Sequence, residues 1–426
     1  MTAPRTAYDR KQHAAAHTSE YLFNQLIPYI GNKRKLLKLI EAAIQRTSAG
    51  KTAKAGTFLD LFAGSGVVSR MAKLHGYRVI SNDWEPYAQA INRCYVACNR
   101  PPAFDALGGY EKAIERLNGL PARVGWVTEH LCPRDDANYD VRADRMFYMR
   151  KNGMRIDAIR EQIAAWKDAG RLSDDEEACL LAPLVYQACY RSNTSGVFKG
   201  FHNGWGGQTR TALYRIATDL HLDVPVFHDN GRENLVFRED AQTLAERLAS
   251  EEIEIAYLDP PYNQHPYGSN YHVLNSVVLW DKPELSKQIT RGTKAAIRLD
   301  WRTERRSAYN YREEASTAYR RLLGAINARY ILTSYSTDGT IPLEAMLQAN
   351  VARGQVSLVM QGYKRYRVSS QRFSKKPMNV EFVLVLDTHG KQGASAEELR
   401  EMIERHESQV LDAHPEMACC CNPSKT

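Results

Sequence analysis

Short apolar runs that end in polar or glycine residues recur along the chain. The first three are TFLDLF (57–62), YRVISND (77–83) and IEIAYLD (253–259). Apolar runs of this length, bounded by loop residues, predict strands that are buried on both faces of a parallel sheet. Between the first two lies VVSRMAKLHG (67–76), a helical segment that ends at Gly76, a residue typical of helix C-termini. Strand, glycine loop, helix and strand form a βαβ unit, so the pattern predicts an α/β fold with an open, doubly wound sheet.

The second half of the chain holds further strand patterns. The segments expected to join the sheet are KAAIRLD (294–300), YILTSYS (330–336) and VEFVLVLD (380–387), and QVSLVMQGYKRYRV (355–368) is expected to form a hairpin arm. After residue 390, SAEELREMIERHESQV (395–410) predicts a charged helix, followed by a flexible tail.

The interval between the second and the third of these strand patterns has a helical pattern instead. Its segment SDDEEACLLAPLVYQACYRS is helical, and Ser173 and Glu176 at its start form a capping-box signature. A loop rich in glycine, asparagine and aromatic residues follows, NTSGVFKGFHNGWGG (193–207), and the sheet pattern resumes near NLVFREDA (234–241). We therefore expect one sheet domain, 20–100 and 232–390, interrupted by a mainly helical inserted domain, 101–231, and followed by a C-terminal helix and tail, 391–426.

Composition and charge narrow the class of protein. Among 426 residues, 43% are hydrophobic and 25% charged, which is typical of a globular chain. The sequence shows no apolar run of the roughly 18 residues that a membrane span needs, and no signal peptide at its start, so a cytoplasmic protein is expected. The eight cysteines lack zinc-finger spacing, and the CCC triplet (419–421) is expected to hold reduced thiols rather than a metal.

The formal charge of +8 favours a polyanionic partner. Basic residues cluster in WRTERR (301–306), YKRYR (363–367) and QRFSKK (371–376). Each cluster fits a solvated face, but the aromatic residues within the last two favour a nucleic-acid surface.

The first candidate site is the glycine loop DLFAGSG (60–66) between the first strand and helix. Gly64 and Gly66 remove the Cβ atoms that block a ligand from approaching the backbone. A dinucleotide fingerprint needs a third glycine before the helix, but here GSGVVS continues with valines. The loop therefore predicts a ligand with a nucleoside and a compact polar end.

An acid follows the second strand, in SNDWEP. Asp83 is placed to accept hydrogen bonds from both hydroxyls of a ribose. The alternative is an N-cap of the helical segment EPYAQAINRCY. The glycine loop one strand earlier favours the ribose.

The third strand runs into LDPPY. Asp259 ends the strand at the edge of the sheet where ligands of such folds bind. Pro260 and Pro261 stiffen the turn and fix the direction of their carbonyls, and Tyr262 presents a ring. A carboxylate and a carbonyl suit an amino group with two hydrogens, and the ring suits a flat heterocycle. The motif predicts a pocket for an exocyclic amine of a base; the alternative is an ordinary proline turn.

Together these motifs resemble those of the Dam-like, alpha-group family of DNA adenine N6-methyltransferases. The match is carried by YIGNKRKLL (29–37), FLDLFAGSGVVS, SNDWEP, YLDPPY, REDA (238–241) and the loop segment CYRSNTSGVFKGFHNGWGG. DPPY is typical of adenine enzymes, and SPPY of cytosine N4 enzymes. The resemblance implies a Rossmann-like S-adenosylmethionine-dependent methyltransferase sheet with an inserted target-recognition domain.

The resemblance also implies roles for individual residues. The expected cofactor-binding residues are Tyr29, Asn32, Lys33, Asp60, Phe62, Gly64, Gly66, Asp83, Asp240 and Asp259. Asp259, the Pro260 carbonyl and Tyr262 are the expected catalytic residues, with target recognition by Arg191, Asn193, Lys199 and Arg210 and phosphate contacts by Arg365, Arg367 and Arg372. Lys33 also fits a solvent-facing start of a basic helix.

The implied reaction transfers the methyl group of S-adenosyl-L-methionine to the N6 amine of a flipped adenine in double-stranded DNA, without a metal. The implied setting is a bacterial restriction–modification system, with a separately acting endonuclease as partner and a protein that is a monomer or weak dimer, in the cytoplasm and on the nucleoid when bound to DNA. The alternatives are a cytosine N4 or RNA methyltransferase and an inactive or regulatory DNA-binding protein. In QHPYGSNYHVL, Tyr267, Asn270, Tyr271 and His272 are expected to border the flipped base or to begin a helix.

Overall fold

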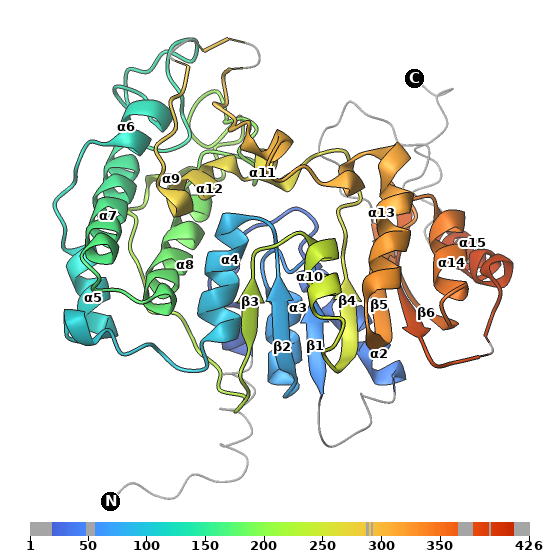
Figure 1. Ribbon diagram of the computed structural model, residues 1–426. Helices are drawn as coiled ribbons and strands as arrows, with labels where there is room; N and C mark the ends of the chain where they lie inside the picture. Colours follow the sequence, from blue (N-terminus) through green and yellow to red (C-terminus); the bar gives the residue numbers. More distant parts are fainter. Residues whose placement is uncertain are drawn as a thin grey trace, which may run out of the picture. The chain divides into compact units, whose positions relative to one another are not determined.

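The computed structural model describes residues 19–47, 56–286, 289–290, 293–364, 378–391 and 393–412 (Figure 1). In these residues seven strands form one sheet in the order β3-β2-β1-β4-β5-β7-β6. The strands are β1 (Thr57–Asp60), β2 (Arg78–Asn82), β3 (Leu235–Phe237), β4 (Ile253–Leu258), β5 (Ala328–Ser336), β6 (Gln355–Lys364) and β7 (Met378–Asp387). β1 pairs with β4, β4 with β5 and β2 with β3 in parallel, whereas β7 runs antiparallel to both β5 and β6. The α/β class with a mostly parallel sheet is confirmed.

Most of the predicted strands are found. The runs at 57–62, 77–83, 253–259, 330–336 and 380–387 correspond to β1, β2, β4, β5 and β7. The hairpin arm is β6, paired with β7, and its predicted end at 365–368 lies outside the described residues. The expected helix at 395–410 is α15 (Ala396–Asp412).

The strand predicted for KAAIRLD (294–300) is wrong. The segment forms turns and leads into the 3-10 helix η5 (Asp300–Arg302), and Ala296 has a positive φ of 50°. Its polar groups are engaged elsewhere: the guanidinium of Arg145 binds the Lys294 carbonyl, and Arg298 pairs with Asp281. Such ties hold the backbone away from an extended ladder.

The chain divides into two compact units. Unit 1 takes in the chain up to Lys33, Ala63–Arg238 and Tyr267–Arg306, and unit 2 takes in Arg34–Phe62, Glu239–Pro266 and the chain from Ser307 on. The predicted inserted domain, 101–231, falls within unit 1, and its boundaries stay a prediction.

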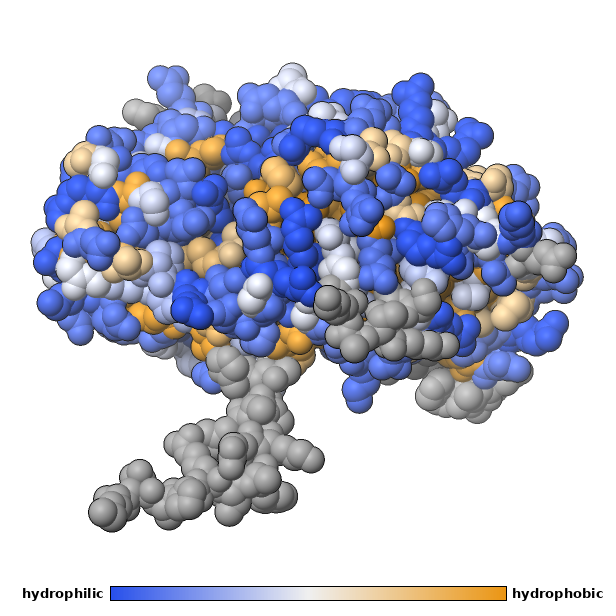
Figure 2. Space-filling model, turned by 60° about the horizontal axis from the view of Figure 1, so that its bottom comes forward, coloured by the Kyte–Doolittle hydropathy of each residue, from blue (hydrophilic) through white to orange (hydrophobic). Residues whose placement is uncertain are grey.

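On the face drawn in Figure 2, hydrophilic side chains predominate and hydrophobic ones form small groups between them. Among the described residues, no helix is both long and apolar enough to cross a membrane.

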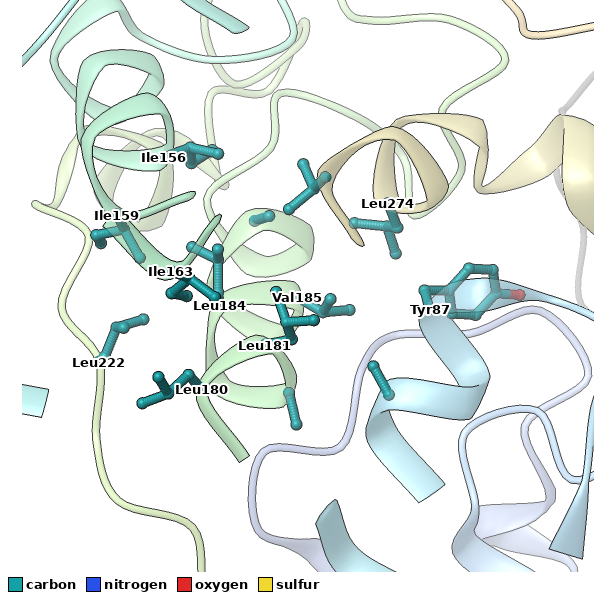
Figure 3. Packing of buried hydrophobic residues seen from close by; sticks show 14 of the residues in the cluster. Tyr87, Ile156, Ile159, Ile163, Leu180, Leu181, Leu184, Val185, Leu222 and Leu274 are labelled. Carbon is teal, nitrogen blue, oxygen red and sulfur yellow. The ribbon is translucent and has the colours of Figure 1, made fainter. Parts of the chain in front are cut away.

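Unit 1 is mainly helical. Its helices are α3 (Val67–Leu74), α4 (Pro86–Asn92), the π-helix η3 (Arg93–Ala97), η4 (Asp105–Leu107), α5 (Tyr110–Asn118), α6 (Trp126–Leu131), α7 (Arg150–Asp168), α8 (Asp174–Tyr190), α9 (Leu213–Ala217), α11 (Tyr267–Asn270), α12 (His272–Leu279) and η5. Figure 3 shows Ile159 and Ile163 of α7 facing Leu180 and Leu184 of α8, and all four are fully buried. Burying each such side chain contributes about 1.5–3 kcal/mol. This packing fixes α8, whose C-terminal end leads into the loop at 193–207.

Helix α8 also has its own local ties. The predicted capping box is confirmed: the Glu176 N–H donates to the Ser173 hydroxyl at 3.2 Å, and the Ser173 N–H donates to the Glu176 carboxylate at 2.8 Å. Pro183 lies inside the helix and cannot donate to the carbonyl of Cys179, four residues earlier. The Tyr110 hydroxyl donates to that carbonyl instead, at 2.5 Å. The helix therefore continues through the proline without an orphaned acceptor.

Several arginines in unit 1 have internal roles. Arg145 donates to the carbonyls of Lys294, Ser286, Thr293 and His130, and Arg160 donates to the carbonyls of Val277 and Val278 at the end of α12. Part of the positive charge counted in the sequence is therefore used to hold loops and helix ends, and is not offered to a polyanion.

Unit 2 contains β1, β4, β5, β6 and β7. Its helices are α2 (Leu37–Arg46), α10 (Ala241–Arg247), η6 (Ala308–Asn310), α13 (Arg312–Ala325), α14 (Leu343–Val351) and α15. Helix α2 packs on β5, β6 and β7, and α15 packs on β6 and β7. These helices support the half of the sheet that adjoins β4, which pairs with β5 and ends at the DPPY turn.

Candidate active site

The glycine loop between β1 and α3 needs both of its predicted glycines. Gly64 and Gly66 have φ angles of 51° and 77°, in the left-handed region. A Cβ on Gly64 lies 2.9 Å from the Tyr29 ring, and one on Gly66 lies 2.3 Å from Oδ1 of Asn92. The loop is therefore packed so closely that no side chain fits at either position.

Asp83 ties the glycine loop to the end of β2. The N–H of Gly64 donates to Oδ2 at 2.7 Å, and the N–H of Glu85 donates to Oδ1 at 2.9 Å. Helix α4 begins at Pro86 with Glu85 as its N-cap residue, so Asp83 does not cap the helix. Burial raises the pKa of the Asp83 carboxyl to about 6. The carboxyl is therefore mostly ionised at neutral pH and gains its proton as the pH falls through about 6.

Asn92 supports the same loop from α4, and sequence reasoning missed it. Its amide donates to the Gly64 carbonyl at 3.2 Å and to the Ala88 carbonyl at 2.8 Å. The residue is buried near the end of a helix, where asparagine is an unfavourable residue unless its side chain has partners. That unusual placement, in AINRCY, is the signal that points to it.

The N-terminal motif YIGNK forms a turn in unit 1. The Asn32 N–H donates to the Tyr29 carbonyl at 3.1 Å, and the Lys33 ammonium donates to the Gly31 carbonyl at 3.1 Å. Lys33 is only 3% exposed, whereas Arg34 next to it is exposed. The solvent-facing alternative for Lys33 is therefore wrong.

Unit 1 also contains a buried ion network around Glu85 and Arg305. The Glu85 carboxylate accepts from the Asn275 amide at 2.6 Å and lies 3.5 Å from the Arg305 guanidinium, which also pairs with Asp300 at 2.8 Å. Burial raises the pKa of Glu85 to about 7, although Arg305 opposes the shift. The Arg305 side chain is 8% exposed, so this member of the WRTERR cluster belongs to the interior rather than to a solvated or DNA-binding face.

In unit 2, two of the predicted acids stand at the ends of neighbouring parallel strands. Asp60 at the end of β1 pairs in register with Tyr257 of β4, and Asp259 lies two residues beyond Tyr257. Asp60 is fully buried and Asp259 is half-buried. The fold therefore brings both carboxylates to the carboxyl edge of the sheet, where ligands of such folds bind.

The DPPY turn is held from several sides. Pro260 is buried, and the Tyr262 ring packs edge-on against Tyr335 of β5 with centroids 5.4 Å apart. The Asn310 amide donates to the Asn263 carbonyl at 2.7 Å. These contacts add to the stiffness of two prolines and hold the Tyr262 ring and the turn that follows Asp259 within unit 2.

Asp240, predicted to hold an adenine amine, is the N-cap of α10. Its Oδ1 accepts from the N–H groups of Gln242 and Thr243, at 3.0 and 3.2 Å, while Oδ2 takes part in neither bond. Phe62 packs edge-on against Tyr309 at 5.5 Å, and Asp240 is among the charges that, after burial, raise the pKa of the Tyr309 phenol. Tyr309 is a further aromatic residue near these predicted positions that sequence reasoning did not single out.

The loop at 193–207 is organised by Asn193. Its amide donates to the carbonyls of Met146, His202 and Gly204, and its Oδ1 accepts from the Gly206 N–H. Asn193 is fully buried, so in this conformation it shapes the loop and does not read a base.

The other predicted DNA contacts differ in exposure. Arg191 is half-buried, donates to Gln187 and to the Arg215 carbonyl, and lies over the Tyr190 ring. Lys199 is half-buried, and Arg210 is exposed. Arg365, Arg367, Arg372 and the cysteines at 419–421 lie outside the described residues.

An α/β sheet with a glycine loop after its first strand and an acid–proline–proline–tyrosine turn after β4 is the arrangement that the sequence motifs predicted for a methyltransferase. The chain belongs to the D12 class N6 adenine-specific DNA methyltransferase family, whose model matches residues 29–309.

Curated relatives agree with this family. The type II methyltransferase M.NlaIII of Neisseria lactamica is 30% identical over 361 residues, which cover 84% of this chain and 98% of the relative. The type II methyltransferase M.CviAII of Paramecium bursaria Chlorella virus 1 is 31% identical, over 80% of this chain and 93% of the relative. The modification methylase StsI of Streptococcus sanguinis is 30% identical over 80% of this chain, which spans 48% of that longer protein. No solved structure gives a significant match.

Proposed function

We propose that this protein transfers the methyl group of S-adenosyl-L-methionine to the N6 amine of a flipped adenine in double-stranded DNA, as the modification enzyme of a type II restriction–modification system. The observation that carries the proposal is the DPPY turn, held at the end of β4 next to the acid that ends β1. The relatives named as modification methylases support the biological setting. A cognate endonuclease is then a separate partner, and the enzyme acts as a monomer or weak dimer in the bacterial cytoplasm.

The residues present fit the cofactor. In unit 1 the half-buried Asp83 carboxylate is suited to ribose hydroxyls, and Gly64 and Gly66 keep side chains out of the loop beside it. In unit 2, Phe62 is suited to the methionine part of the cofactor and Asp240 to the amine of its adenine. Tyr29, Asn32 and Lys33 complete the proposed cofactor set, with Asp60 and Asp259 near the amino end. When bound, S-adenosyl-L-methionine supplies a methyl group activated by its sulfonium.

The catalytic task of the protein is to prepare the adenine amine. Its nitrogen lone pair is delocalised into the ring, so the amine is a weak nucleophile. The Asp259 carboxylate and the Pro260 carbonyl accept its two N–H bonds and draw the nitrogen toward a tetrahedral geometry, which localises the lone pair. Positioning and fixed charges supply this effect, because the turn that carries both acceptors is rigid before the base arrives.

The base leaves the duplex to reach these groups. Flipping costs a few kcal/mol, roughly, and stacking on the Tyr262 ring offsets about 1–3 kcal/mol of it. Arg191, Lys199 and Arg210 are the proposed target readers. They lie in or next to the loop at 193–207, the recognition loop, which Asn193 supports from within. Arg365, Arg367 and Arg372 are proposed to contact phosphates and to add to the salt dependence of binding.

Gly64 and Asp259 belong to different units, so their approach to one another stays a prediction of this proposal. A crystal structure with sinefungin bound tests it, since one ligand molecule is expected to contact both residues.

The reaction itself is tested by long-read sequencing of DNA from cells that express the protein. A single sequence motif with methylated adenine is expected, and cells that express the Asp259→Ala variant are expected to lack it. Methylation at cytosine N4 instead supports the cytosine alternative. Unmodified DNA from cells with folded wild-type protein leaves the inactive DNA-binding alternative.

A further inference from the structure

Residues Tyr267–His272 of unit 1 hold the N-terminal motif by the backbone of one residue. The Tyr267 hydroxyl donates to the Ile30 carbonyl at 3.1 Å, and the Tyr271 hydroxyl accepts from the Ile30 N–H at 2.7 Å. The Ile30 side chain is 43% exposed, so the residue is anchored by its backbone and not by its side chain. Both hydroxyls therefore bind the backbone of a single residue, Ile30, in the N-terminal motif.

The same short segment holds the recognition loop in the same manner. The Phe198 N–H donates to the Asn270 carbonyl at 2.7 Å, and the Phe198 carbonyl lies 2.9 Å from Nε2 of His272. Burial lowers the pKa of His272 to about 4, so the ring is neutral near pH 7. A carbonyl only accepts, so Nε2 carries the proton and donates. Both backbone groups of Phe198 are thus satisfied by two residues of the segment.

The rings extend the first of these contacts to the glycine loop. Tyr29 stacks on Tyr267 at 5.1 Å and on Tyr271 at 4.9 Å, with interplanar angles of 15° and 18°. The Tyr29 ring is also the group that a Cβ on Gly64 meets. Holding Ile30 therefore fixes the ring that covers the glycine loop.

Burial decides between the two expectations for this segment. Asn270, Tyr271 and His272 are each at most 3% exposed, and α11 and α12 run through them. Tyr267, which is half-buried, begins α11, and His272 begins α12 after its N-cap residue Tyr271. The burial of Asn270, Tyr271 and His272 leaves these three unavailable to border a flipped base.

We propose that Tyr267–His272 is a two-sided positioning segment. The hydroxyls of Tyr267 and Tyr271 set the cofactor-binding turn at 29–33, and Asn270 with His272 sets the recognition loop at 193–207. The proposal rests on the proposed function, and it assigns positioning roles, because these residues act through Ile30, Tyr29 and Phe198.

The cofactor side is tested with the double variant Tyr267→Phe/Tyr271→Phe, which keeps both rings and removes both hydrogen bonds. Its dissociation constant for S-adenosyl-L-methionine, measured by calorimetry without DNA, is expected to rise at least about fivefold. The KM for the cofactor is expected to rise with it, while kcat at saturating cofactor changes less and duplex affinity stays within about twofold of wild type.

The matched control is Tyr110→Phe. It also removes a buried hydroxyl that donates to a backbone carbonyl, that of Cys179 in α8. A lower Tm with unchanged cofactor affinity is expected, which separates loss of stability from loss of positioning.

The loop side is tested with His272→Leu and His272→Gln. The leucine variant has no donor for the Phe198 carbonyl and is expected to bind its methylation-site duplex at least about fivefold more weakly, with cofactor affinity unchanged. The glutamine variant retains a donor and is expected to recover part of the duplex affinity.

This split between the two ligands supports the inference. Two results overturn the inference: wild-type affinities in both sets of variants, or equal losses for both ligands in both sets. In either case, normal methylation by the wild-type protein leaves the proposed function intact. A folded wild-type protein that binds no S-adenosyl-L-methionine and methylates no duplex overturns the proposed function, and this inference with it.

Discussion

The N–H of Gly64 donates a 2.7 Å hydrogen bond to the carboxylate of Asp83. One acid thus shapes the glycine loop and, in the proposed function, receives the ribose of the cofactor. Because burial raises its pKa to about 6, both tasks depend on pH in an accessible range.

Cofactor affinity is expected to fall as the pH drops below about 6, because the protonated acid loses much of its strength as an acceptor. Asp83→Asn is expected to weaken cofactor binding about 10- to 100-fold at pH 8 and to remove this pH dependence. Calorimetric titrations between pH 5 and pH 8, roughly, measure both effects. Glu85→Gln is the control, since Glu85 titrates at about 7 in the same region.

The stability contributed by Asp83 has the opposite trend. Its folded-state pKa lies above the ordinary value of 3.8, so its contribution is fully present below that value and is lost as the pH rises through about 6. The free energy of unfolding, compared for wild type and Asp83→Asn, checks the sign. A binding defect that simply followed stability would contradict the ribose assignment.

Gly66→Ala is expected to damage the cofactor site. The new Cβ is placed at a φ of 77° and 2.3 Å from Oδ1 of Asn92, whose amide is held by two carbonyls. We expect a loss of about 1–3 kcal/mol in stability and a more than roughly tenfold weaker cofactor affinity.

Gly76→Ala is the matched control for that variant. Gly76 has a φ of 84°, but a Cβ there meets nothing within 4 Å. It should show the backbone strain alone, about 1–2 kcal/mol, with normal cofactor affinity. Equal affinity losses in both glycine variants would argue against a cofactor at the loop.

Asp259→Ala is expected to lower the single-turnover rate of methyl transfer at least about 100-fold, because one of two acceptors of the amine is lost. The Tm of the folded variant is the control for stability. Near-normal turnover in a folded Asp259→Ala protein would refute the mechanism.

Tyr262 is expected to matter through its ring. Tyr262→Ala should weaken the complex with a flipped base by about 1–3 kcal/mol, and Tyr262→Phe should retain most of the affinity. Fluorescence of 2-aminopurine at the target position reports the flipped state. A phenylalanine variant as defective as the alanine one would shift the role from stacking to the hydroxyl.

Asn193→Ala is expected to weaken duplex binding while leaving cofactor affinity unchanged, because four backbone groups of the loop and its neighbours lose a partner. Filter binding with the methylated-motif duplex measures the effect. Asn350→Ala is the control for a general loss of stability, because it also removes a buried side-chain amide, but one in unit 2. Unchanged duplex affinity would separate the loop from DNA recognition.

Prediction from the sequence succeeded where interactions among neighbouring residues determine the structure. The apolar runs of β1, β2 and β4, the capping box at Ser173 and the glycine loop follow from burial, caps and φ requirements that act within a few residues. For the same reason, the two prolines after Asp259 predicted the stiff turn.

Long-range partners could not be predicted in this way. KAAIRLD reads as a strand until Arg145 and Asp281, distant in sequence, bind its polar groups. WRTERR reads as a basic surface until Glu85 draws Arg305 into the interior. Asn92 and Tyr309 acquire their places only through tertiary packing.

Phe198 is bound by Asn270 and His272 through its peptide groups, and every amino acid except proline offers the same pair. Substitution of exposed loop residues such as Ser195 and Asn203 therefore leaves these two backbone hydrogen bonds in place. Under the proposed function, such substitutions change the recognised DNA sequence without altering the residues proposed for methyl transfer.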